Sequence, residues 1–202
     1  MTALGQGICV VGSKLHTMRE ILPVTAAISM RLIPFVFTAL MLTSVPAAAE
    51  RLQFNHRLHP QVKAVLDSGR SEMVSFDASD PKYLVDRIVV EGKSVSDWTE
   101  EFEIIARSEQ KGMNSAADWL ADMRRGFDRR CANTISVIAQ DYGSITFERH
   151  TPSCPAERAE SGIYRIVAGK HSLFLLAALR KGPISDESKR LWLALLASAH
   201  LE

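Results

Sequence analysis

The hydrophobic period of the chain changes at Cys131, and this change constrains the fold more than any other feature. Upstream, apolar side chains recur at helical spacing from Ala116 to Phe127, and Cys131 continues the same stripe. Downstream, the segments 134–139 and 144–150 alternate between apolar and polar residues, with Asp-Tyr-Gly in the turn between them. The sequence therefore predicts an amphipathic helix that leads directly into a β-hairpin.

The first part of the chain contains the three-part pattern of a secretory signal peptide. Arg31 precedes the apolar run 32–45, and an Ala-Ala-Ala motif follows it and ends at Ala49. The apolar run is short for a bilayer span. We therefore predict that residues 30–49 are a signal peptide cleaved after Ala49, with an uncleaved membrane anchor as the alternative.

Residues 1–29 do not fit this pattern, because a signal peptide normally begins close to the start of the chain. We interpret Met30 as the true start and residues 1–29 as a mis-annotated upstream extension. The remaining residues, 50–202, have the length of one domain with its own core.

Charge and hydropathy exclude several classes of partner. The whole chain has 24 basic and 23 acidic side chains and a formal net charge of +1, which gives no electrostatic footprint for nucleic acid. Neither a polybasic run nor a second apolar stretch of spanning length follows the signal peptide. The sequence thus predicts no nucleic-acid partner and no membrane span after cleavage, and leaves an unknown protein or small molecule as the partner.

Two cysteines remain after cleavage, Cys131 and Cys154. An exported chain folds in an oxidising compartment, so we predict a disulfide between them, with a stabilisation of about 3.5 kcal/mol from the chain-entropy model. His150 offers a third ligand for a metal ion beside the two cysteines, but no fourth ligand is evident. We therefore assign no metal site and no cofactor.

The rest of the chain contains further strands and a second substantial helix. The segments 83–90 and 99–106 read as strands, and 163–167 with 172–179 as another hairpin. Ser185 is a good N-cap for a C-terminal helix. Runs of adjacent strands with only two main helices predict the α+β class, with an antiparallel sheet of about five to seven strands.

This order of elements resembles a known family. The sequence Asp-Trp-Thr-Glu at 97–100 enters a strand, a helix ends at Cys131, a hairpin ends at Cys154, and an apolar strand around Phe174 precedes the last helix. The pattern resembles small, uncharacterised exported bacterial proteins with a Mog1/PsbP-like α+β sandwich. The resemblance implies a binding or assembly role, and it brings no catalytic residues.

Five residues form a candidate binding surface. Thr146, Glu148 and His150 lie on one face of a predicted strand, although an ordinary solvent-exposed face gives the same alternation. His171 is expected at the tip of a hairpin, where a solvated turn residue is the simpler interpretation. Trp98 precedes a strand, where it is either a ligand contact or a buried anchor.

Other polar residues are interpreted as solvated. Glu100, Glu101 and Glu103 follow each other in a strand start and are assigned to a solvated sheet edge. His56 and His59 are assigned to a solvated N-terminal segment.

These observations predict a non-enzymatic, exported binding or envelope-assembly protein with no assigned catalytic residue. One alternative is a small periplasmic hydrolase that uses His150 or His171 with Glu148 or a nearby Asp. Another alternative is a small-molecule carrier, which would have an apolar pocket between helix and sheet.

Overall fold

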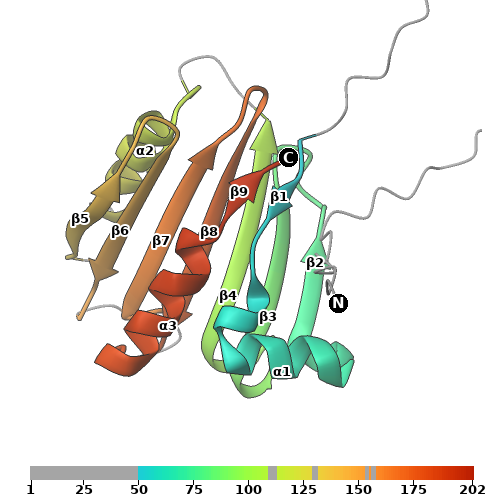
Figure 1. Cartoon of the computed structure of the whole chain (residues 1–202). Helices are drawn as coiled ribbons and strands as arrows, with labels where there is room; N and C mark the ends of the chain where they lie inside the picture. Colours follow the sequence, from blue (N-terminus) through green and yellow to red (C-terminus); the bar gives the residue numbers. More distant parts are fainter. Residues whose placement is uncertain (1–49, 109–112, 129–131, 153–154, 156–157) are drawn as a thin grey trace, which may run out of the picture. The chain divides into compact units, whose positions relative to one another are not determined.

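The computed structural model describes residues 50–108, 113–128, 132–152, 155 and 158–202. Its centre is a seven-stranded sheet in which every neighbouring pair is antiparallel (Figure 1). From edge to edge the strands are β2 (Val74–Asp77), β3 (Leu84–Ser94), β4 (Asp97–Ser108), β8 (Ser172–Arg180), β7 (Ser161–Ala168), β6 (Ser144–His150) and β5 (Thr134–Gln140). The predicted α+β class and antiparallel sheet are confirmed.

Helices cover both faces of this sheet (Figure 1). The helices α1 (Pro60–Ser68) and α3 (Asp186–Ala197) pack on one face, and α2 (Ala116–Asp128) packs on the other. Successive residues of β8 alternate between the two layers: Leu176 belongs to the core under α1 and α3, and Leu175 to the core under α2. This alternation explains the continuous apolar run of β8, because a central strand buries both of its faces.

Two groups of consecutive strands meet in the middle of the sheet. The strands β2, β3 and β4 form one meander, and β5 to β8 form the other. The pairing of β4 with β8 joins them, with Phe102 opposite Ala178 and Ile104 opposite Leu176. This junction positions the cleft described below.

Local side-chain chemistry accounts for the ends of the elements. Ser115 precedes α2, and its Oγ accepts a hydrogen bond from the backbone N–H of Asp118 at 3.1 Å, as the sequence predicts for a capping box. Ser185 caps α3 in the same way, accepting from the N–H of Ser188 at 3.2 Å. Gly92 has φ of +140° in the β3–β4 hairpin, and a Cβ there would lie 2.5 Å from the carbonyl oxygen of Asp97. Only glycine fits this turn.

The two ends of the domain are tied together. The short strands β1 (Leu52–Gln53) and β9 (His200–Leu201) pair, and the backbones of Arg51 and Glu202 exchange two hydrogen bonds. The carboxylate of Glu50 accepts bonds from the N–H groups of Lys170 and His171 in the β7–β8 hairpin. Residue 50, the first after the predicted cleavage point, is therefore part of the described fold.

The prediction that His59 is solvated is wrong. His59 is 2% exposed, and its Nδ1 accepts from the N–H of Val62 at 3.5 Å as the N-cap of α1. Its ring lies 3.8 Å from that of Trp192, measured between centroids. The turn that leads into α1 contacts α3 here and buries this histidine, and no local sequence pattern reveals such a contact.

For two further predictions, the outcome depends on which residues the structure describes. Cys131 and Cys154 lie outside them, so their disulfide remains a prediction. Within the described ranges, no helix has the length and apolar character that a membrane span requires.

Candidate functional site

The predicted polar row on β6 lies under α3. Thr146, Glu148 and His150 do share one face, as the alternation predicts, because Phe147 belongs to the core on the opposite face. Glu148 forms an ion pair with Lys189 of α3 at 2.5 Å, and the Oγ of Thr146 accepts from Arg165 at 3.2 Å. These contacts attach β6 to α3 and to β7. Of the three residues, only His150 is exposed.

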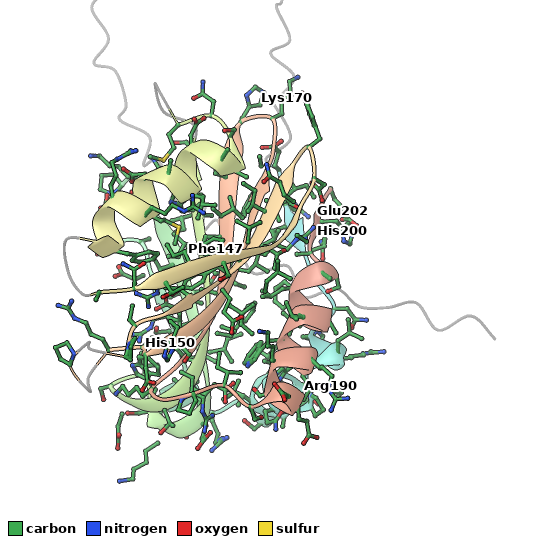
Figure 2. The ribbon with its side chains drawn as sticks, turned by 90° about the vertical axis from the view of Figure 1, so that its left-hand side faces the viewer. Phe147, His150, Lys170, Arg190, His200 and Glu202 are labelled. Atoms are coloured by element: carbon green, nitrogen blue, oxygen red, sulfur yellow. The ribbon has the colours of Figure 1, made fainter. Side chains whose placement is uncertain are left out.

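The two candidate histidines lie at opposite ends of the sheet. His150 pairs with Ser161 at the start of β7, whereas His171 follows the end of β7. Figure 2 shows this separation through His150 and Lys170, the neighbour of His171. The structure therefore does not bring His150, His171 and Glu148 together.

A cleft opens between α2 and the part of the sheet around the β4–β8 junction; we call it the α2 cleft. Its volume is about 560 Å³. The apolar floor comes from β4, β8 and β7 and consists of Ile105, Leu175, Ala177, Leu179 and Tyr164. Met123 and Phe127 of α2 form one side, and Trp98 also lines the cleft. Of the five predicted surface residues, Trp98 is the one that contributes to it.

One wall of the α2 cleft carries a compensated charge cluster. Arg87 of β3 donates to Glu101 at 2.6 Å through Nη2, and its Nε lies 3.1 Å from Glu103. Glu101 is 1% exposed, and burial raises its pKa from 4.5 to about 7, an effect that the adjacent Glu103 increases and Arg87 opposes. Burial likewise raises the pKa of Glu103.

The assignment of these carboxylates to a solvated edge is therefore wrong. β4 is an interior strand, and Arg87 directly opposite Glu103 supplies the charge that makes burial of the carboxylates tolerable. Arg87 lies beside these carboxylates because of the register of β3 against β4, and the local sequence of β4 does not contain that register.

The opposite wall carries a cation without such compensation. The guanidinium of Arg149 lies 4.3 Å from the centroid of the Phe127 ring and 5.7 Å from that of Tyr164. Its Nη2 donates to the carbonyl of Ala159 at 3.4 Å, and its buried Nε has no hydrogen-bond partner among the residues that the structure describes. Among the ion pairs formed by the described residues, none includes Arg149 or the exposed Arg158 nearby.

Tyr164 lies on the floor of the cleft beside Arg149 and borders this wall. Its ring stacks on Phe147 at 4.8 Å between centroids, and burial raises the pKa of its hydroxyl to about 12, so the hydroxyl is neutral at physiological pH. The ring folds over Gly162, which stands opposite Arg149 on β7; a Cβ on Gly162 would lie 2.6 Å from the ring. Glycine at this position therefore allows the aromatic contact beside Arg149.

A second, polar pocket of about 450 Å³ lies between the first turns of α1 and α3. Its buried carboxylate, Glu100, accepts hydrogen bonds from Trp192 at 2.5 Å, from Ser188 at 2.9 Å and from Arg180. Burial lowers the pKa of His59, so its ring is neutral despite the nearby Glu100. Because its groups are already bonded to one another, this pocket holds α3 to the sheet.

Sequence reasoning missed Arg149 as a site residue, although a signal for it exists. Ile145, Phe147 and Arg149 alternate onto one face of β6, and the first two are core residues. A cation at the end of an apolar row indicates either a paired buried charge or a ligand contact.

Metal ligation has no support in the described ranges, where no three His, Cys, Asp or Glu side chains gather closely enough to hold an ion. The chain matches no protein-family model, and no curated protein or solved structure matches it.

Proposed function

We propose that this protein is a non-enzymatic binding protein that takes a small, largely apolar molecule into the α2 cleft. The observation that carries the proposal is the apolar floor of Ile105, Leu175 and Leu179, open between a helix and the sheet and bordered by a few charged groups. Ligand sites in proteins typically have volumes of roughly 300 to 1,000 Å³ and this mixture of apolar surface with few polar groups. The 560 Å³ of the α2 cleft lies within that range.

The geometry supports this carrier role over the other two roles considered. The polar row on β6 is bonded to α3 and to β7, so it is a poor surface for assembly with another protein. A hydrolase that combines His171 with Glu148 has no geometric support, because the two lie at opposite ends of the sheet. Glu148 does share a face with His150, but its carboxylate is paired with Lys189. A Mog1/PsbP-like arrangement of the sandwich belongs to the same proposal, since such domains serve in binding and assembly.

The proposal includes export and a disulfide. Expressed with its own leader in a Gram-negative host, the protein is expected in the periplasmic fraction with Glu50 as its first residue. Intact mass should rise by one hydrogen per sulfur after reduction, and alkylation before reduction should leave Cys131 and Cys154 unmodified. A cytoplasmic product that retains Met30, or two thiols alkylated without reductant, would contradict this part of the proposal.

The α2 cleft is tested with a neutral apolar reporter, N-phenyl-1-naphthylamine, whose fluorescence rises when it leaves water. We expect saturable binding of one molecule per chain. Filling the cleft with the double substitution Ile105→Phe and Leu179→Phe should abolish the fluorescence change, because both side chains lie on its floor. Both are only partly buried, so the added rings enter the cleft and the melting temperature should change little.

The matched control is Val137→Phe on β5, which adds the same ring to a residue that is 45% exposed and outside the cleft. This variant should bind the reporter as the parent does. Equal binding by the filled variant and the parent would show that the reporter binds elsewhere and would refute the proposal.

A further inference from the structure

We propose that the ligand of the α2 cleft is an amphipathic carboxylate, whose charged end binds Arg149 and whose apolar body lies along the floor; this inference rests on the proposed function. It concerns the class of ligand, which the volume and apolar character of the cleft leave open.

The two walls of the α2 cleft differ in charge. Arg87 is shared between two carboxylates, Glu101 and Glu103, so that wall has no positive charge to spare. Arg149 has no carboxylate partner within the part of the chain that the structure describes, and Arg158 at the same end adds a second cation. A cation on an apolar surface is costly unless a counter-charge joins it, and a ligand anion supplies one.

The guanidinium of Arg149 is held in place and has donors to spare. The rings of Phe127 and Tyr164 lie beside it at 4.3 and 5.7 Å, which limits its rotation. Within the described residues, its hydrogen bond to Ala159 O is long at 3.4 Å, and the buried Nε has no acceptor. A preorganised planar donor with N–H groups to spare matches the two oxygens of a carboxylate.

The acidic wall favours a carboxylate over a phosphate. Glu101 and Glu103 share the single cation Arg87, so this wall has an excess of acidic groups and would repel a doubly charged anion more strongly than a singly charged one. A single negative charge needs only Arg149, and the neutral hydroxyl of Tyr164 adds no repulsion. The apolar floor between the two walls then accommodates a hydrocarbon body of modest length.

The experiment measures displacement of N-phenyl-1-naphthylamine by ligands with the same ten-carbon chain. Decanoate should displace the reporter at a concentration at least about tenfold lower than decanol does, because a charge-assisted hydrogen bond replaces a neutral one. Decyltrimethylammonium should compete more weakly than decanol. Decyl phosphate serves as the alternative anion and should compete no better than decanoate.

Two substitutions of Arg149 and one control test whether this residue causes the advantage of decanoate over decanol. Arg149→Gln should remove the advantage of decanoate over decanol and leave the affinity for the neutral reporter within about twofold. Arg149→Lys keeps the charge without the planar fork and should retain part of the advantage. The control, Arg125→Gln, makes the same change of net charge on the outer side of α2, where Arg125 pairs with Asp122, and should leave every affinity unchanged.

The outcomes separate this inference from the proposed function. If the reporter binds and the filled variant loses it, but decanoate has no advantage over decanol, the inference is overturned and the function stands. Preference for decyl phosphate, or an advantage for decanoate that survives Arg149→Gln, also overturns it. The comparison of decanoate with decanol uses the unmodified protein, so the test does not depend on the folding of any variant.

Discussion

Replacing Trp192 by alanine is expected to lower the free energy of unfolding by about 4 kcal/mol, the usual cost of removing a buried aromatic side chain. Trp192 is 0% exposed, and its ring lies 3.8 Å from His59 and 5.6 Å from Phe102 between centroids. It thus connects α3 to α1 and to β4 at once. Domains of this size are typically stable by about 5 to 15 kcal/mol, so the loss would be a large share of the total.

A second substitution separates the volume of Trp192 from its hydrogen bond. Trp192→Phe retains most of the packing but removes the N–H that donates to Glu100 at 2.5 Å. Glu100 keeps Ser188 and Arg180 as donors, so this variant should lose only about 1 kcal/mol. Urea denaturation followed by circular dichroism measures both values. Equal losses for the two variants would mean that the hydrogen bond, and not the packing of α3, dominates.

Glu101 is expected to lower the free energy of unfolding by up to about 3 kcal/mol as the pH rises from 5 to 8. Its pKa is about 7 in the folded protein and has an ordinary value of 4.5. Between these values the folded state holds a proton that the unfolded state has released. Raising the pH therefore favours unfolding, and the full stabilisation exists only below about pH 4.5.

The groups around Glu101 set the size of this effect. Burial raises its pKa, Arg87 and Lys181 oppose the shift, and Glu103 adds to it. In Glu101→Gln the dependence of unfolding free energy on pH should shrink by that same amount, while Asp86, whose pKa burial raises to about 6, still titrates in both proteins. The difference between parent and variant therefore isolates Glu101.

Glu103→Gln is the comparison for this experiment. Burial raises the pKa of Glu103 as well, and its side chain is 20% exposed where that of Glu101 is 1% exposed. The variant should change the pH dependence with the same sign and to a smaller extent. An identical pH profile in the parent and in Glu101→Gln would contradict the burial of an ionisable carboxyl group in the α2 cleft.

The elements themselves were predictable because their signals are local. The helical stripe of α2 begins directly after its capping residue, Ser115. The hairpin β5–β6 follows from alternation around an Asp-Tyr-Gly turn, and the apolar run of β8 indicates a strand buried on both faces. Caps, turns and periods are properties of a few neighbouring residues, so one sequence contains them.

The environment of the charged residues was not predictable in the same way. Glu101 alternates with apolar residues as a solvated strand residue would, and only the order of strands places it inside the sheet opposite β3 and β8. His59 follows an unpatterned segment and is buried because the turn that leads into α1 packs against Trp192 of α3. Arg149 can be recognised as a site residue only once the pairing of β6 with β7 places Tyr164 and Gly162 beside it. Each of these depends on contacts between distant segments.

The junction of β4 with β8 should be the slow step of folding. Each meander closes through short loops, whereas Glu100 and Arg180, which pair across the junction, are 80 residues apart. The floor of the α2 cleft takes Ile105 from one strand and Ala177 from the other, so neither meander alone contains the proposed binding site. A ligand bound there is therefore expected to slow unfolding and to leave the folding rate unchanged, and occupancy of the cleft should prolong the lifetime of the native chain without helping it to form.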